Sequence, residues 1–141
     1  VEVLRAIEEP AIFPVHPRTR HKLESAGLWS QVEAIPNLRL APPVGYLDFT
    51  ALLTQARAVV TDSGGVQREA YYMGIPCLTL RDETEWVGTV DVGWNKLVGA
   101  EQQAILENWF SFSPPAEHPF IYGDGTAAQL IAGILNNVPN D

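Results

Sequence analysis

The stretch Ala58–Asp82, AVVTDSGGVQREAYYMGIPCLTLRD, constrains the fold more than any other part of the chain. The short apolar, β-branched run Ala58–Thr61 predicts a buried strand. A helix is predicted over Val66–Met73, because the glycine and the proline that follow it are residues that end helices. Cys77–Leu80 then predicts a second buried strand. The stretch is therefore expected to fold as strand, tight turn, helix and strand.

The turn before this helix holds the residues of the stretch that could bind a ligand. Asp62 and Ser63 are helix N-cap residue types, and Gly64 and Gly65 allow a ligand to approach the backbone closely. Free N–H groups and the helix dipole make such a turn an anion site. Glu69, on the next helical turn, is placed to accept hydrogen bonds from ribose hydroxyls. The pattern favours a nucleoside diphosphate, although short glycine motifs also occur in purely structural turns.

Composition narrows the range of functions. The 141 residues suffice for one domain with a sizeable core. Nine Lys and Arg against 17 Asp and Glu give a net charge of −8, and without a basic cluster this argues against nucleic acid as a partner. No apolar run approaches the roughly 18 residues of a membrane span, and the first ten residues do not resemble a signal peptide, so a soluble cytoplasmic protein is expected. The single cysteine, Cys77, and the absence of paired His or Cys ligands predict neither a disulfide, a metal nor a cofactor.

Strands and helices are predicted to alternate along the rest of the chain. Further strands are expected over Ala11–Val15, Leu38–Leu40 and Lys96–Val98. Helices are expected over Thr19–Ala26, Tyr46–Ala56, Glu101–Phe110 and Ala127–Asn136, with a short helix or turn in Glu83–Val92 and an irregular connection over Trp29–Pro36. This alternation predicts an α/β fold, a Rossmann-like three-layer sandwich around one mostly parallel sheet of about five strands.

Four segments directly follow predicted strands: His16–Arg20, Pro42–Gly45, Asp62–Gly65 and Arg81–Glu85. The carboxyl ends of parallel strands share one edge of a sheet, and ligands of such sheets bind there. We therefore expect all four segments to lie along one edge. Their convergence strengthens the interpretation as a nucleotide site.

A long block of the chain resembles the C-terminal half of the non-hydrolysing UDP-N-acetylglucosamine 2-epimerases: TDSGGVQREAYYMGIPCLTLRDETEWVGTVDVGWNKLVG. The segments PVHPRTR, LAPPVGYLDF and FIYGDGTAAQLI resemble other parts of that family in the same order. The resemblance implies the C-terminal half of a GT-B fold. Residues 1–141 would then be a UDP-binding domain whose N-terminal partner domain is absent. The implied reaction interconverts UDP-N-acetylglucosamine and UDP-N-acetylmannosamine by elimination and re-addition of UDP.

The resemblance also implies roles for individual residues. Ser63, Gly64 and Gly65 would hold the UDP phosphates, and Glu69 the ribose. Phe49 and the Pro43–Tyr46 loop, which includes Val44, would flank the uracil. The final helix would brace the two domains.

Other matching residues would lie at the interdomain cleft. His16 would be near substrate or effector there, and Arg81, Asp82, Thr84 and Glu85 match the family's RDxTE run. The chain departs from many members at Val44, where they carry Gln, and at Trp86, where they carry Arg.

Alternatives remain for these residues and for the whole chain. His16 could make only a structural hydrogen bond, Arg81 could simply pair with Glu85, and the aromatic residues Trp86, Trp94, Trp109, Tyr71 and Tyr72 could serve packing. No catalytic residue is expected in this chain, which would be inactive alone. The full-length enzyme is expected to be a homodimer, and the oligomeric state of this chain by itself stays open. The alternative functions are a hydrolysing 2-epimerase, the sugar-nucleotide half of a GT-B glycosyltransferase, and a stand-alone nucleotide-sensing module.

Overall fold

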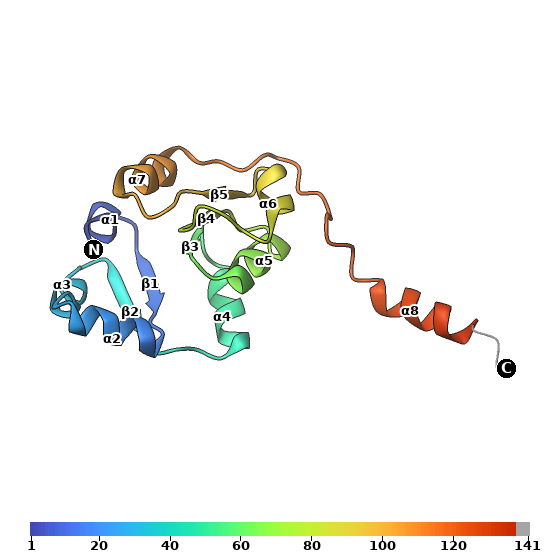
Figure 1. Ribbon diagram of the computed structural model, residues 1–141, viewed down its shortest axis with the longest axis horizontal. Coiled ribbons are helices and arrows are strands. Elements are labelled where there is room, and N and C mark those ends of the chain that lie inside the picture. Colours follow the sequence, from blue (N-terminus) through green and yellow to red (C-terminus); the bar gives the residue numbers. More distant parts are fainter. Residues whose placement is uncertain (138–141) are drawn as a thin grey trace.

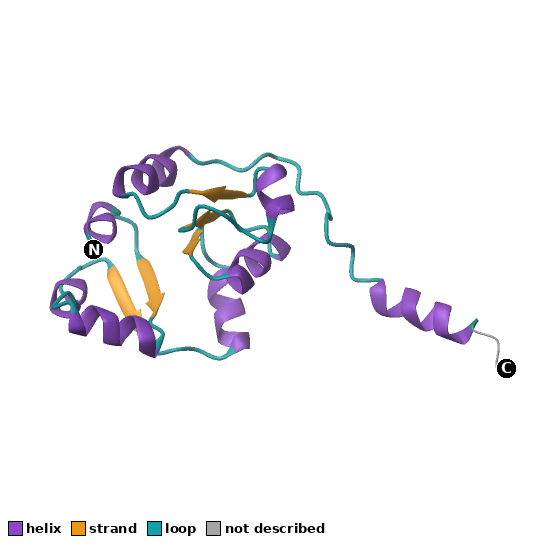
Figure 2. Ribbon diagram, viewed as in Figure 1, coloured by secondary structure: helices purple, strands orange, loops and turns teal. Residues whose placement is uncertain are grey.

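The computed structural model describes residues 1–137 as an α/β fold with parallel strands (Figures 1 and 2). The strands form a two-stranded sheet of β1 (Ala11–Pro14) and β2 (Leu38–Ala41), and a three-stranded sheet in the order β3 (Val59–Thr61), β4 (Cys77–Thr79), β5 (Asn95–Leu97). Every pairing is parallel, as the alternation of strands and helices predicts. The fold class is therefore confirmed.

The prediction of one continuous sheet is wrong. Among residues 1–137, no strand pairing joins the β1–β2 sheet to the β3–β5 sheet. Side chains connect the two parts instead: the Glu9 carboxylate accepts a hydrogen bond from Trp109 Nε1 at 3.1 Å and pairs with Arg57 Nη2 at 3.0 Å. The Arg57 guanidinium also lies 4.3 Å from the centre of the Trp109 ring. Alternation predicts strands and their direction, but tertiary packing decides which edges pair.

The three-stranded sheet has helices on both faces, and β4 at its centre is fully buried. Cys77 faces a core cluster with α4 (Tyr46–Leu53) and α5 (Gly64–Tyr72), whereas Leu78 faces a second cluster with α7 (Gln102–Ser111). Successive residues of a strand point to opposite faces, so this alternation follows from strand geometry. The expected three-layer arrangement holds for this sheet.

Two of the helices differ from the predicted elements. Helix α2 (Pro17–Ser25) begins two residues earlier than expected, because proline is well suited to the first helical position. Helix α3 (Trp29–Glu33) occupies part of the predicted connection, since a helix this short shows no periodicity in the sequence. Helices α1 (Glu2–Ala6) and α6 (Val87–Asp91) are single short segments of the same kind.

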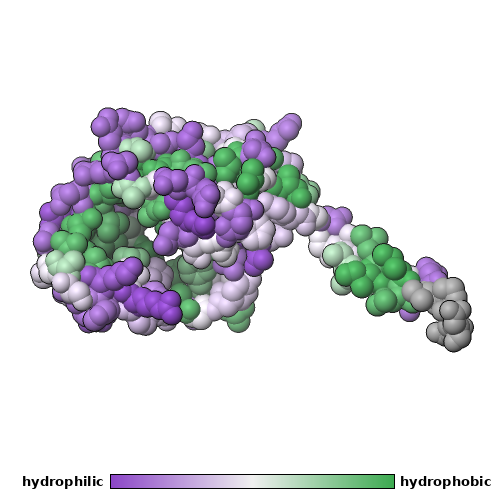
Figure 3. Space-filling model, in the orientation of Figure 1, coloured by the Kyte–Doolittle hydropathy of each residue, from purple (hydrophilic) through white to green (hydrophobic). Residues whose placement is uncertain are grey.

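The C-terminal part of the described chain leaves the body of the domain. After α7 an irregular segment leads to α8 (Ala127–Asn136), which projects away from the sheets (Figure 1). No residue of α8 is buried, and Figure 3 shows an apolar surface on it; its large apolar side chains are 56–67% exposed: Leu130, Ile131, Ile134 and Leu135. None of the helices within residues 1–137 has the length and apolarity needed to cross a membrane.

Candidate nucleotide-binding site

The turn between β3 and α5 presents an uncapped helix N-terminus. Ser63 is the N-cap residue of α5, but its side chain makes no capping hydrogen bond. Its backbone N–H donates instead to Thr61 Oγ1 at 3.1 Å, which orients the turn. The first backbone bond of the helix joins Gln67 N–H to the Ser63 carbonyl, so the preceding amides of the first turn have no intrahelical acceptor. The geometry leaves these amides and the exposed Ser63 hydroxyl available to a ligand, and their role as an anion site stays a prediction.

The loop that follows β4 lies across this turn. The Glu85 carboxylate occupies the space beside the Gly64 Cα in which a Cβ would sit, and Trp86 Nε1 is 3.4 Å from the same point. Arg81 Nη1 is 3.1 Å from Glu85 Oε2. The pKa of Glu85 is lowered, first by a hydrogen bond from its own backbone N–H and then by Arg81. Arg81 and Glu85 therefore pair, as one alternative held, and they do so at the glycine turn.

A buried polar network fixes this loop to α5 and β5. Gln67, which is fully buried, accepts hydrogen bonds at Oε1 from Thr84 Oγ1 at 2.6 Å and from Asn95 Nδ2 at 3.2 Å. Asn95 Oδ1 accepts from Thr79 Oγ1 at 2.7 Å. Buried polar groups that are left unpaired are costly, so these bonds hold the loop in one position.

The sequence analysis missed Gln67 and Asn95. One signal was present for Gln67, because it stands one helical turn after Ser63 and shares a helix face with the buried residues Ala70 and Tyr71. A glutamine on the core side of a helix needs buried partners. Asn95 gave no such signal, since its partners come from three other elements and two of them precede it by more than ten residues.

Two more of the residues expected to contact a ligand, Glu69 and Phe49, lie on helices that pack against the three-stranded sheet. Glu69 is half-buried on α5, and its carboxylate makes no hydrogen bond to any residue in the described range 1–137. Phe49 on α4 packs against the core cluster of Leu53, Ala70, Ile75 and Cys77 while staying partly exposed. The ribose and uracil roles of these two residues remain predictions.

His16 and Val44 follow the strands of the two-stranded sheet. His16 is the N-cap of α2, and its Nδ1 accepts the Arg18 backbone N–H at 3.2 Å. This is the structural hydrogen bond that one alternative for His16 held, and His16 Nε2 makes no hydrogen bond with any residue in the range 1–137. Val44 is half-buried just before Gly45, the N-cap of α4. The convergence of all four segments on one sheet edge is thus not seen, because they belong to two sheets.

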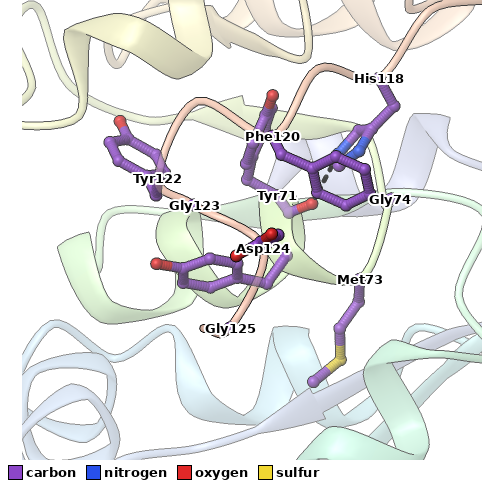
Figure 4. Close-up of a pocket in the computed structure, with 10 residues that line it drawn as sticks. Tyr71, Met73, Gly74, His118, Phe120, Tyr122, Gly123, Asp124 and Gly125 are labelled. Atoms are coloured by element: carbon purple, nitrogen blue, oxygen red, sulfur yellow. Dashed lines mark hydrogen bonds between the residues drawn. The ribbon is translucent and has the colours of Figure 1, made fainter. Parts of the chain in front are cut away.

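An aromatic cluster lies at the other end of α5. It lines a hollow of about 460 Å³ (Figure 4). The lining residues come from the end of α5 and the turn after it and from the irregular segment before α8: Tyr71, Tyr72, Met73, Gly74, His118, Phe120, Tyr122, Gly123, Asp124 and Gly125. His118 Nε2 lies 2.7 Å from the Tyr71 carbonyl, and the two rings stack at 4.4 Å. The Tyr122 ring meets Trp86 edge-on at 5.5 Å, so this cluster extends back to the glycine turn. The aromatic rings of this cluster pack against one another.

Comparison with known proteins decides the family. The sequence profile of the UDP-N-acetylglucosamine 2-epimerase family matches residues 1–136. The chain belongs to this family. It is 47% identical over 131 residues to the UDP-N-acetylglucosamine 2-epimerase homolog of Methanococcus maripaludis, covering 92% of this chain and 37% of that protein. It is also 42% identical over 140 residues to the UDP-2,3-diacetamido-2,3-dideoxy-D-glucuronate 2-epimerase of Pseudomonas aeruginosa, covering 96% and 38% of the two chains.

Solved structures of 2-epimerases have the same fold. The crystal structure of the Methanocaldococcus jannaschii UDP-GlcNAc 2-epimerase in complex with UDP-GlcNAc and UDP superposes with a TM-score of 0.86 at 34% identity, covering 97% of this chain and 38% of that one. The Neisseria meningitidis enzyme bound to UDP-GlcNAc gives a TM-score of 0.67 at 32% identity, over 89% and 36% of the two chains. The chain thus spans less than two fifths of the length of these 2-epimerases.

Proposed function

We propose that this chain is the UDP-binding, C-terminal domain of a 2-epimerase that interconverts UDP-N-acetylglucosamine and UDP-N-acetylmannosamine. The observation that carries the proposal is the open amide turn at Ser63–Gly65, at the carboxyl end of β3. It is supported by membership of the 2-epimerase family and by the UDP present in the crystal structure of the M. jannaschii relative. Two statements are part of this proposal: that the chain is the C-terminal, UDP-binding domain, and that the substrate is UDP-N-acetylglucosamine.

The chemistry assigned to this domain is the handling of the leaving group. In the reaction the C2 proton is removed, the bond from C1 to the diphosphate breaks, and UDP adds again after the proton returns to the opposite face of C2. Amides at the N-terminus of α5 would stabilise the negative charge on the departing UDP and keep it oriented for re-addition. The groups that move the C2 proton would come from the rest of the protein, so the 141-residue chain alone would bind UDP without epimerising it.

A second substrate is favoured by one comparison. The identity to the UDP-2,3-diacetamido-2,3-dideoxy-D-glucuronate 2-epimerase of P. aeruginosa is 42%, against 38% for the UDP-N-acetylglucosamine 2-epimerase of M. maripaludis. Both enzymes invert C2 of a UDP-sugar, as their names state, so the UDP-binding part of the proposal is unaffected. Activity of the full-length protein on each of the two sugar nucleotides separates the candidates.

Binding of UDP to this chain tests the proposal directly. Calorimetric titration with UDP, UMP and GDP is expected to show saturable UDP binding that is weaker for UMP and for GDP. Glu69→Ala should weaken UDP binding by about tenfold, because it removes a charged acceptor of the ribose hydroxyls. Glu33→Ala, an exposed glutamate on α3, is the matched control and should bind UDP normally. UDP binding that is absent from the full-length protein, or equal in Glu69→Ala, would refute the assignment.

The exposed face of α8 fits the same proposal. Its apolar side chains have nothing to pack against within residues 1–137, and the relatives contain a further three fifths of sequence. We assign this helix to packing against the remainder of the full-length protein. Leu130→Glu should leave the free energy of unfolding of the 141-residue chain unchanged and lower that of the full-length protein. Equal effects on both would contradict this role.

A further inference from the structure

The indole N–H of Trp86 is a buried donor without an acceptor. Trp86 Nε1 has less than 1 Å² of accessible surface and makes no hydrogen bond with any residue of the described chain. By contrast, Trp94 Nε1 donates to the Glu117 carbonyl at 2.8 Å and Trp109 Nε1 donates to Glu9 at 3.1 Å. An unpaired buried N–H destabilises the folded state, so its persistence calls for a partner that binds at this place.

This donor lies beside the glycine turn. Trp86 Nε1 lies 3.4 Å from the position that a Cβ on Gly64 would take, directly beside the free amides of α5. A ligand atom that accepts from the first amides of this helix therefore comes within reach of the indole N–H. The unpaired donor therefore borders the same position beside Gly64 that the Glu85 carboxylate occupies.

The network described above holds Trp86 in this position. Its backbone N–H donates to Thr84 Oγ1 at 3.1 Å, and its carbonyl accepts from Thr89 Oγ1 at 2.7 Å. Its ring contacts the Tyr122 ring, with the ring centres 5.5 Å apart, and the Arg68 guanidinium lies 5.3 Å from its centre. A donor that is fixed on all sides is pre-organised for binding, because little conformational freedom is lost when the ligand arrives.

Arg68 adds a positive charge to this arrangement. It is exposed on α5, and no carboxylate within residues 1–137 forms a salt bridge with it, whereas Arg81 is paired with Glu85. A guanidinium over the face of an indole is attracted by the ring and withdraws electron density from it, which makes the N–H a stronger donor. The pair also brings one cation near the turn in a chain whose net charge is −8.

We propose that Trp86 is a specificity-determining residue whose indole N–H donates a hydrogen bond to a phosphate oxygen of the UDP moiety bound at the Ser63–Gly65 turn, with Arg68 reinforcing it. The proposal rests on the assignment of this turn as the UDP site. It makes the chain selective for the diphosphate rather than for the nucleoside. Tryptophan thereby supplies one neutral, directional donor to the phosphate at this position.

The test compares UDP with uridine in the full-length protein and in Trp86→Phe. Phenylalanine keeps an aromatic ring beside Arg68 and Tyr122, but it removes the N–H together with the five-membered ring of the indole. Trp94→Phe is the matched control, because its N–H donates to a carbonyl near the aromatic cluster, away from the turn. Calorimetry should show that Trp86→Phe binds UDP about tenfold more weakly, while its uridine affinity stays unchanged. Trp94→Phe should leave both affinities unchanged.

The outcomes distinguish this proposal from the one it rests on. If the unmodified protein does not bind UDP, the UDP-site assignment fails. If it binds UDP and Trp86→Phe binds it equally well, only the role of Trp86 fails. Equal loss of UDP and uridine affinity would show that Trp86 is structural and would overturn the proposal too. Trp86→Arg provides a second variant: it restores a donor, so UDP affinity should recover and become more sensitive to salt, and failure to recover counts against a phosphate contact.

Discussion

The carboxylate of Glu85 lies against the Cα of Gly64, in the space that the Cβ of any other residue would need. These two residues come from the loop after β4 and from the first turn of α5. A phosphate that binds the amides of this turn must therefore move Glu85 aside. The backbone N–H of Glu85 itself and an exposed pair with Arg81 hold the carboxylate there, and exposed pairs of this kind are weak, so this movement costs little.

Gly64→Ala is expected to weaken UDP binding at least tenfold without unfolding the protein. The added methyl group displaces the flexible end of the Glu85 side chain, so the free energy of unfolding should change by less than about 1 kcal/mol. The same methyl group occupies the space through which the phosphate approaches the amides. Calorimetry and urea denaturation measure the two effects. Gly133→Ala, where a Cβ meets open space, is the control, and unchanged UDP affinity in Gly64→Ala would contradict the site.

Glu85→Gln is expected to strengthen UDP binding by about fivefold. A carboxylate beside the bound phosphate repels it, and the amide removes this repulsion while keeping the size of the side chain. The exposed neighbour Glu83 provides a control, since Glu83→Gln changes the net charge equally. Weaker UDP binding in Glu85→Gln would show instead that the carboxylate contacts the bound nucleotide.

Asn95→Leu is expected to lower the free energy of unfolding by about 2–4 kcal/mol, because it leaves buried polar groups unpaired. Thr79 would lose its acceptor, and Gln67 would lose one of its two donors. Asn108→Leu, which removes a single hydrogen bond to the Ala104 carbonyl within α7, should cost about 1 kcal/mol or less. Urea denaturation followed by circular dichroism measures the free energy of unfolding of both variants. Similar losses in Asn95→Leu and Asn108→Leu would argue against a cooperative network.

The Cys77 thiol is expected to be unreactive in the folded protein. Burial at the centre of the sheet raises the pKa of this thiol to about 11, so the reactive thiolate is scarce at neutral pH. A chromogenic thiol reagent should react slowly in native buffer and within seconds in concentrated urea. Rapid stoichiometric labelling of the native protein would show that β4 is accessible.

Stability in acid should depend on the contact between Glu9 and Trp109. The Trp109 hydrogen bond, with a smaller effect of Arg57, lowers the pKa of Glu9 below its ordinary value of 4.5. A lowered pKa stabilises the folded state above that value, and the stabilisation is lost as the pH falls through the folded pKa. Trp109→Phe should therefore lower the free energy of unfolding more at pH 7 than at about pH 3.5. If the difference in free energy of unfolding between the two proteins does not change with pH, the Glu9 carboxylate does not cause it.

Local patterns predicted most of the elements correctly. The order of β3, α5 and β4 and the bounds of α8 agree with expectation, because apolar runs, N-cap residues and helix-ending glycines act over a few residues. Helix α5 begins at Gly64 rather than at the expected Val66, so both glycines of the predicted turn are its first helical residues. Helix α3 was missed because a five-residue helix has too few positions to show a period. The separation into two sheets was missed because the sequence of a strand does not determine which other strand it pairs with.

The sequence by itself determined the parallel α/β class, the position of the glycine turn at the start of α5, and the family to which the chain is similar. Only the tertiary structure decided that Glu85 covers Gly64, that Trp86 places an unpaired N–H beside the same turn, and that Glu9 meets Trp109 across 100 residues. The physical reason is one of range. Periodicity and capping act between neighbours along the chain, whereas buried hydrogen bonds are satisfied by whichever residues the packing of the whole domain brings together.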